Sequence, residues 1–197
     1  MTALATPPPL TGMFPRLLTA ADLAVLPSEL PSGPVFWELD NGRLVVMAPP
    51  GYIHARCEPK ISKQLMIQGE ERGLGLVCGE VGIMLWRNPD RVVGADAAFI
   101  ANQSLPARLS PEGYLDTIPD LVVEVRSKND TQPEIDHKVN DYLTAGVRVV
   151  WVADPAAGIV TAYRPGQAPQ VFGPQDTLTV DDVIPGFRMP VRDVFAV

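Results

Sequence analysis

The apolar residues of this chain repeat with two periods, one typical of helices and one typical of strands. Between residues 54 and 72 they recur at about every fourth position, which predicts an amphipathic helix that ends at a glycine. Similar spacing predicts a second helix over residues 134–145. A shorter helix is predicted over residues 19–26, because Thr19 and Asp22 form the pattern of a capping box.

Shorter apolar runs between these helices predict strands. They cover residues 35–40, 43–48, 81–86, 91–100, 119–126, 148–154 and 159–164, and the tail holds two or three more. Asn41-Gly42 separates the first two runs and is typical of a type I′ hairpin turn. Strands that alternate with helices in mid-chain indicate a mixed sheet with a helix on each face. We therefore expect an α/β fold, or α+β in looser terms. The GxGxxG and GxxxxGK patterns of nucleotide-binding folds do not occur in the sequence.

The length of 197 residues is typical of one domain with a substantial core. Residues 1–18 are rich in proline and aperiodic, so we expect a flexible N-terminal lead-in before a single domain over residues 19–197. Every apolar run is too short for a transmembrane helix, and the first residues lack the basic and apolar regions of a secretion signal. These features predict a cytoplasmic protein.

Two acids interrupt strands that are otherwise apolar. Glu124 stands among leucine and valine residues, and a buried charge is costly unless it is paired or binds a cation. Asp96 lies in the run VVGADAAF, where alternation places the small residues Gly94 and Ala98 on its face. The alternatives are a surface ion pair for Glu124 and a turn-capping or edge-strand role for Asp96.

If the two strands are neighbours, Asp96 and Glu124 can bind one hard cation. Mg²⁺ favours one or two carboxylates together with water and phosphate oxygens, and Mn²⁺ is an alternative ion. Such an ion can activate a water molecule for attack on a phosphodiester. The two acids therefore predict a metal-dependent hydrolase.

Two basic residues could supply a positive charge beside these acids. Arg126 follows Glu124 by two residues on the same strand face, and Lys138 lies at the edge of the apolar stripe of helix 134–145. A partly desolvated ammonium can lose its proton whereas a guanidinium stays charged, so chemistry favours Lys138 as the catalytic cation. Spacing alone also allows a solvated ion pair between Lys138 and Glu134, one helical turn earlier.

The net charge of −7 is unlike that of a protein that grips nucleic acid without specificity, so contact with DNA requires a local basic patch. Candidates on or near the polar face of the first long helix are Arg56, Lys60, Lys63 and Arg72. A simply solvated helix face is the alternative. The two cysteines, Cys57 and Cys78, form neither a disulfide framework nor a CxxC zinc motif.

The chain resembles the Uma family of putative restriction endonucleases, within the PD-(D/E)xK nuclease superfamily. The resemblance is carried by the segments PDLVVEV, DHKVNDYLTAGVRVVWVADP and ELDNGRLVVMAPPGYIHARCEPKISKQL. It runs from about Leu18 to the C-terminus. It implies a restriction endonuclease-like fold, which is a mixed β-sheet flanked by helices.

The resemblance also implies roles for individual residues. Asp96 and Glu124 match the metal ligands, and Lys138 matches a catalytic lysine that has moved onto a helix. His54 matches a histidine at the start of the long helix, and Glu38 matches an acid before the hairpin turn.

The chain departs from the family pattern at two places. Ala95 stands before Asp96 where proline is usual, and Arg126-Ser127-Lys128 follows Glu124 where a hydrophobic residue and Ser-Pro are typical. Because of the second departure, Arg126 remains an alternative to Lys138 as the catalytic cation.

Four further residues have two interpretations each. Asp120 either caps its strand or assists the metal through one of its ligands, and His54 is either a site residue or an inert residue at a helix start. Tyr142 and Trp151 are predicted to be core residues, with stacking against nucleic-acid bases as the alternative.

These observations predict a Mg²⁺-dependent endonuclease that hydrolyses DNA. We expect a homodimer, because two sites related by a twofold axis would match the two strands of a duplex. The alternative is a catalytically silent module with a nuclease fold that serves binding or assembly.

Overall fold

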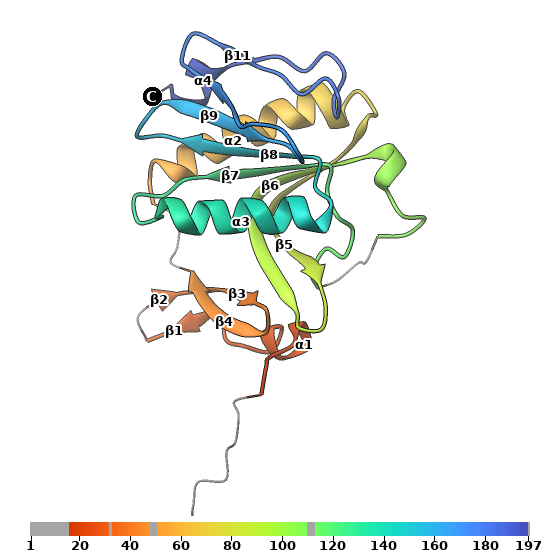
Figure 1. The fold of residues 1–197 in the computed structure, drawn as a ribbon, viewed down its shortest axis with the longest axis vertical. Coiled ribbons are helices and arrows are strands. Elements are labelled where there is room, and N and C mark those ends of the chain that lie inside the picture. The colour runs from red at the N-terminus through yellow and green to blue at the C-terminus, as the bar shows by residue number, and fades with distance from the viewer. Residues whose placement is uncertain (1–15, 32, 48–50, 110–112, 197) are drawn as a thin grey trace, which may run out of the picture.

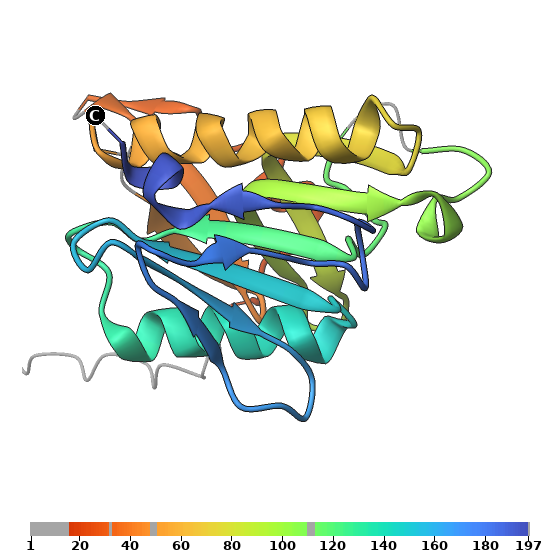
Figure 2. The same cartoon turned by 90° about the horizontal axis from the view of Figure 1, so that it is seen from above.

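A mixed β-sheet with a long helix on each face forms the body of the protein (Figure 1, Figure 2). The computed structural model describes residues 16–31, 33–47, 51–109 and 113–196. Helix α2 (His54–Leu65) covers one face of the sheet, and α3 (Gln132–Ala145) covers the other. The predicted α+β fold with a helix on each face is confirmed.

The sheet has eight strands in the order β10-β9-β8-β7-β6-β3-β4, and β5 pairs with β6 outside this path. The strands are β3 (Phe36–Asp40), β4 (Arg43–Met47), β5 (Gly75–Trp86), β6 (Arg91–Ala101), β7 (Leu121–Val125), β8 (Val149–Asp154), β9 (Ile159–Tyr163) and β10 (Gln170–Phe172). Strands β7 and β8 run parallel and the remaining pairs of the sheet are antiparallel. Because α3 connects the parallel pair, this helix lies directly over β7 and can place side chains beside Glu124.

Smaller elements surround the sheet. They are α1 (Ala20–Leu23), α4 (Val191–Phe195), the π-helical turn η1 (Met66–Glu70), the 3-10 turn η2 (Asn102–Ser104), and the two-stranded pairs β1 (Glu29–Leu30) with β2 (Gly33–Pro34) and β11 (Thr177–Leu178) with β12 (Met189–Pro190). None of the described helices is long and apolar enough to cross a membrane.

Local sequence signals explain several of these boundaries. Asn41 and Gly42 both have positive φ, 50° and 78°, as a type I′ turn between β3 and β4 requires. Thr19 closes a capping box at the start of α1, and Thr131 closes another at the start of α3. At its other end α3 stops at Gly146, which adopts the left-handed conformation with φ 110°.

Three features differ from the sequence prediction. Strand β5 begins at Gly75 instead of residue 81, because continuous pairing with β6 compensates for glycines that interrupt its alternation. The helix predicted over residues 54–72 is α-helical only to Leu65 and continues as η1. Helix α4 was not predicted, since five residues are too few to show a helical period.

The N-terminal lead-in predicted over residues 1–18 lies mostly outside the described residues. Its last residue is ordered against the hairpin, because the Leu18 amide donates to the Gly42 carbonyl at 2.8 Å. The Ala20 amide donates to Asp90 Oδ2 at 2.8 Å. The folded domain therefore includes at least Leu18.

The sheet separates two apolar clusters. On the α2 side Ile61 and Leu65 pack with Phe99 and Trp151, and these side chains are fully buried. On the α3 side the cluster includes Ile135, Val139, Tyr142, Val122 and Val150. Each fully buried aliphatic side chain contributes roughly 1.5–3 kcal/mol relative to exposure. The charged residues described next lie around the middle of β6 and the C-terminal end of β7.

Candidate active site between β6 and β7

Asp96 and Glu124 lie opposite each other on neighbouring strands. The β6–β7 ladder pairs Ala98 with Val122 and Ala97 with Val123, so one further step places Asp96 across from Glu124. At this step the Asp96 side chain replaces a backbone acceptor, because its Oδ2 accepts a hydrogen bond of 2.5 Å from the Val125 amide. The strands on which sequence analysis placed the two acids are therefore direct neighbours.

Strand β6 changes face at Asp96. Ala95 packs in the cluster on the α3 side, whereas Ala97, two residues later, packs in the cluster on the α2 side. Regular alternation would put both on one face, so the alternation that placed Gly94 and Ala98 beside Asp96 does not continue through this point. At this irregularity the Asp96 carboxylate contacts the backbone of the neighbouring strand and a side chain from α2.

His54, the first residue of α2, contacts Asp96 from one side. Its Nε2 lies 2.9 Å from Asp96 Oδ2, and only 10% of its side chain is exposed. Burial lowers the pKa of His54, but the Asp96 hydrogen bond and the charges of Asp96, Glu80 and Glu124 raise it above its usual value. Oδ2 thus has two donors, while no hydrogen bond within the described part of the chain engages Oδ1 of Asp96.

Glu124 has a different donor on each of its two oxygens. The Tyr142 hydroxyl donates to Oε1 at 2.6 Å, and the Lys138 ammonium donates to Oε2 at 3.1 Å. Burial raises the pKa of Glu124 to about 7, and the charges of Asp96 and Glu38 add to this effect against the opposing influence of Lys138 and Tyr142. Burial therefore disfavours the charged form of Glu124, and a cation at this position would offset that cost.

The Lys138 ammonium fills its hydrogen-bonding capacity inside the protein. It donates to the Gly94 carbonyl at 2.8 Å and to Glu124 Oε2, and it lies 3.2 Å from Oε1 of Glu38. Burial lowers its pKa, but the charges of Glu124, Glu38 and Asp96 outweigh burial and raise the pKa above the usual value. The expectation that this ammonium could lose its proton is therefore wrong for this arrangement. Lys138 is held as a cation.

The solvated pair between Lys138 and Glu134 does not form. Glu134 instead accepts hydrogen bonds from the Thr131 amide at 2.9 Å and from the Thr131 hydroxyl at 2.7 Å, which lower its pKa. Only 16% of the Lys138 side chain is exposed. This lysine therefore turns toward the sheet.

Glu38 joins the cluster from β3. Its Oε1 accepts a hydrogen bond from the Gly94 amide at 2.9 Å and also faces Lys138, while its Oε2 lies 3.7 Å from the buried guanidinium of Arg91. Arg91 donates to Asp141 Oδ2 at 2.7 Å. Glu38 is thus connected to a second buried ion pair and holds the lysine from the side opposite Glu124.

Two residues that the sequence suggested as supporting groups lie elsewhere. Asp120 precedes β7 and accepts hydrogen bonds from the Ala101 amide, the Ser104 hydroxyl and Arg148. It therefore ties η2 and β8 to the far end of β7, which is the structural alternative.

Arg126 follows β7, but its guanidinium turns away from Glu124. It donates to Gln132 Oε1 at 3.0 Å and to Asp154 Oδ2 at 3.3 Å. The structure thus brings Lys138, and not Arg126, to Glu124.

Sequence analysis missed Glu80. This residue lies opposite Asp96, between the pairs Gly79–Ala97 and Val81–Ala95, and has a positive φ of 47°. Such a conformation is uncommon for glutamate and no sequence pattern indicates it. Burial, Asp96 and Glu58 raise its pKa, which shows that it adds negative charge on the α2 side of the cluster.

A second group with metal-ligand spacing lies beside this cluster and consists of Asp40, His137 and Asp141. His137 Nε2 lies 3.5 Å from an oxygen of each aspartate. Arg91 already binds the Asp141 oxygen, so a divalent ion there would meet a fixed positive charge.

Three of the basic residues on or near α2 bind backbone carbonyls of the C-terminal segment. Lys60 donates to the carbonyls of Val194 and Ala196, and Arg56 donates to the Ala196 carbonyl at 3.4 Å. Arg72, which follows η1, donates to the Pro185 carbonyl at 2.9 Å. These contacts fasten the C-terminal segment to α2, a structural use that neither a solvated helix face nor a phosphate-binding track describes.

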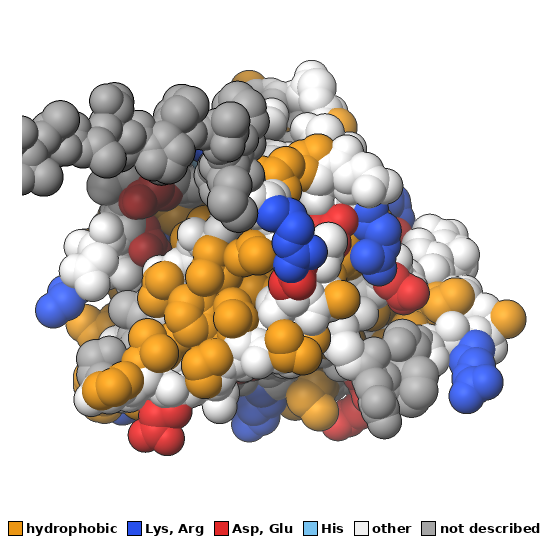
Figure 3. Space-filling model, turned by 90° about the horizontal axis from the view of Figure 1, so that it is seen from below, with side chains coloured by type: hydrophobic (Ala, Val, Ile, Leu, Met, Phe, Trp, Pro, Cys, Tyr) orange, Lys and Arg blue, Asp and Glu red, His pale blue; other side chains and the backbone are white. Residues whose placement is uncertain are grey.

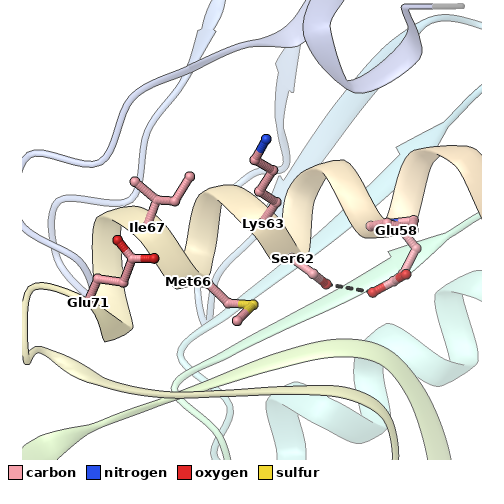
Figure 4. Close-up of a pocket in the computed structure, with 7 residues that line it drawn as sticks. Glu58, Ser62, Lys63, Met66, Ile67 and Glu71 are labelled. Atoms are coloured by element: carbon pink, nitrogen blue, oxygen red, sulfur yellow. Dashed lines mark hydrogen bonds between the residues drawn. The ribbon is translucent and has the colours of Figure 1, made fainter.

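Lys63 instead projects from the outer side of α2, beside a shallow hollow of about 400 Å³ (Figure 4). The hollow is lined by Glu58, Pro59, Ser62, Lys63, Met66, Ile67 and Glu71. Its lining includes neither Asp96 nor Glu124, so it is separate from the candidate active site.

Comparisons with known proteins show the family and the fold of the chain. The family model described as "Uma2: Putative restriction endonuclease" matches residues 26–192. A solved structure from Anabaena variabilis, described as a putative nuclease belonging to DUF820, superposes with a TM-score of 0.74 and 18% sequence identity, covering 91% of this chain and 98% of that chain. At that identity the likeness shows the fold alone. No significant match to a curated protein was found. With its fold and 167 consecutive residues matched, the chain belongs to the Uma2 family of putative restriction endonucleases.

Proposed function

We propose that this protein is an endonuclease that hydrolyses phosphodiester bonds in DNA with the help of Mg²⁺ or Mn²⁺. The observation that carries the proposal is the placement of Asp96 and Glu124 opposite each other, with the ammonium of Lys138 beside them. Family membership supports the reaction class. The fold alone would not, since one fold serves many functions.

The residues of the cluster fit a hard divalent cation. Asp96 offers Oδ1, which has no donor among the described residues, and Glu124 offers Oε2, whose only partner there is Lys138. Carboxylate oxygens are the ligands that Mg²⁺ prefers, and a bound cation would offset the burial that raises the pKa of Glu124. When bound, the ion would polarise a phosphate oxygen and make a water molecule more acidic.

The side chains around the two acids would perform the remaining tasks. His54 and the Val125 amide orient Asp96 by binding its Oδ2. Lys138 would stabilise the negative charge that develops on the phosphate, for which a permanent cation is suited. Because its contacts are all internal, it must exchange at least one of them, and the contact with Glu124 Oε2 is the one that a metal ion would replace.

A homodimer remains part of the proposal. Two active sites related by a twofold axis would address the two antiparallel strands of a duplex. Analytical ultracentrifugation would test it: a monomer at working concentrations, with or without DNA, would contradict this part.

The test of the proposed function combines cleavage and metal binding. Wild-type protein should cut plasmid or single-stranded DNA in Mg²⁺ or Mn²⁺ and bind the ion in isothermal titration calorimetry. Asp96→Ala and Glu124→Ala should lose both properties while the far-UV circular dichroism spectrum is retained. Asp120→Ala is a control for removal of an acid that lies just before β7 and outside the cluster, and it should keep metal binding. A folded wild type that binds neither ion and cuts no DNA would instead support a silent binding or assembly module.

A further inference from the structure

We propose that Tyr142 is a positioning residue that fixes the carboxylate of Glu124 so that Oε2 faces the metal position. This inference rests on the proposed function, because it assumes that Glu124 is a metal ligand. Neither the sequence pattern nor family membership assigns this task to the tyrosine, which the sequence alone places among core residues.

The geometry of α3 gives the tyrosine this position. Lys138 and Tyr142 are four residues apart on α3 and thus lie on the same helix face. The lysine binds Oε2 of Glu124, and the tyrosine hydroxyl binds Oε1 at 2.6 Å. One helix thereby holds both oxygens of a carboxylate on the neighbouring strand.

The Tyr142 hydroxyl binds the Glu124 carboxylate in preference to a backbone carbonyl of the core. Tyr142 is fully buried, and its only other partner among the described residues is the Gly94 carbonyl at the longer distance of 3.3 Å. A hydroxyl has one proton to donate, and a bond to an ionised acceptor is stronger than one to a neutral carbonyl. The Tyr142 hydroxyl therefore donates its proton to a hydrogen bond with Glu124 Oε1.

A related division of oxygens occurs at Asp96. There Oδ2 is bound by His54 and by the Val125 amide, and Oδ1 has no donor in the described ranges. Each proposed ligand thus has one oxygen held by orienting donors, while the other oxygen has no donor there at Asp96 and binds Lys138 at Glu124. Partners that orient ligands in this way typically change metal affinity or activity by 10–100-fold when they are removed.

The test compares Mn²⁺ binding by wild type, Tyr142→Phe and Tyr163→Phe. Tyr163, on β9, packs at the margin of the same apolar cluster, so its variant controls for loss of a hydroxyl near α3. In calorimetry Tyr142→Phe should bind Mn²⁺ roughly 10–100-fold more weakly. The electron paramagnetic resonance spectrum of its bound Mn²⁺ should also change, whereas Tyr163→Phe should match wild type in both measurements.

The Mn²⁺ measurements distinguish a failure of the positioning role of Tyr142 from a failure of the proposed function. If wild type binds Mn²⁺ and folded Tyr142→Phe binds it equally well with an unchanged spectrum, the positioning role is wrong while the proposed function stands. If wild type binds no Mn²⁺, the proposed function fails and this inference fails with it.

A double-mutant cycle covers the case in which Tyr142→Phe is poorly folded. The substitution should lower the melting temperature of metal-free protein less in a Glu124→Gln background, where no charged acceptor loses its donor. Equal losses in both backgrounds would show that the hydroxyl acts independently of Glu124, which would overturn the inference.

Discussion

The ammonium of Lys138 lies 3.1 Å from Oε2 of Glu124, across 14 residues of sequence that include the start of α3. This pair connects the central sheet to its covering helix and leaves few charges uncompensated. It also occupies the oxygen that a metal ion would use. Metal binding and the position of the lysine are therefore coupled.

Replacing Lys138 separates its role in cleavage from any role in metal binding. Lys138→Ala should abolish DNA cleavage, because the charge that stabilises the reacting phosphate is lost. Metal binding should persist or tighten, since removal of a nearby cation leaves Glu124 Oε2 free. Cleavage assays and calorimetry on the same preparation provide the measurements.

Lys63→Ala is the matched control, because Lys63 is a lysine on the outer side of α2 (Figure 4). It should cleave like wild type. Arg126→Ala should also remain active, with at most weaker DNA binding, because its guanidinium binds Gln132 and Asp154. An inactive Arg126→Ala beside an active Lys138→Ala would show that the arginine is the catalytic cation.

Neutralising Glu124 should stabilise the metal-free protein. Its pKa of about 7 shows that the folded state disfavours the charged carboxylate. Glu124→Gln keeps the shape and an acceptor for Tyr142, and Lys138 retains Glu38 and the Gly94 carbonyl. We expect a gain of about 1 kcal/mol at pH 8, seen as a rise of a few degrees in melting temperature.

Asp96→Asn is the informative comparison. Asp96 Oδ2 accepts from both His54 and the Val125 amide, so an amide in its place weakens two contacts. It should stabilise the metal-free protein less than Glu124→Gln does, or destabilise it. A clear loss of stability in both variants would show that the acids are structural partners and not an unfilled cation site.

The stability of the metal-free protein should depend on pH through Glu124. The folded-state pKa of Glu124 is about 7 and the ordinary pKa of a glutamate is 4.5, so between these values the folded state binds more protons than the unfolded state. The free energy of unfolding should therefore decrease as pH rises from about 4.5 to about 7. His54, whose pKa is also raised, changes stability in the same direction at higher pH.

Comparison with Glu124→Gln isolates the glutamate from the histidine. The difference in free energy of unfolding between the two proteins, measured by urea denaturation with a chelator present, should grow in favour of the variant from pH 5 to pH 8. A constant difference across this range would exclude Glu124 as the titrating group.

The parts of the site that sequence could predict are those with an unusual residue type for their position. Acids in apolar strands identified Asp96 and Glu124, and periodicity predicted the strands and helices that place them. Tyr142 could not be identified in this way, because a tyrosine on the apolar stripe of a helix has the same pattern whether it packs or donates a hydrogen bond. Lys138 was equally ambiguous, since a lysine at the edge of that stripe can turn either way.

Features that depend on a break in regularity were also beyond the sequence. The change of face at Asp96 and the positive φ of Glu80 arise from pairing between strands that are distant in the sequence, whereas the sequence prediction assumed a regular alternation of faces.

An exposed hydrophobic surface is another feature that the sequence pattern did not predict. Hydrophobic side chains gather on the side of the molecule where β3 and β4 lie (Figure 3). On this hairpin Phe36 is 50% exposed and Val46 is 59% exposed.

Arg91 provides the strictest test of the buried charge network. Only 4% of its side chain is exposed, and it bridges Asp141 at 2.7 Å, the Leu39 carbonyl at 2.9 Å and Glu38 at 3.7 Å. Removing one member of a buried ion pair leaves the other uncompensated and costs about 3–5 kcal/mol. Arg91→Met should therefore lower the free energy of unfolding by this amount in urea denaturation.

The loss of stability in Arg91→Met should come from the unpaired charge of Asp141, and a second substitution tests this. Combining it with Asp141→Leu removes the stranded charge and should recover part of the stability, because a buried ion pair replaced by apolar residues of similar size is often neutral. Arg87→Met is the control, since Arg87 is largely exposed and lies 3.7 Å from Asp90, and a surface pair contributes roughly 0–1 kcal/mol. If Arg91→Met is as mild as Arg87→Met, the buried network does not hold Glu38 in place, and the position of Lys138 must depend on Glu124 and the Gly94 carbonyl alone.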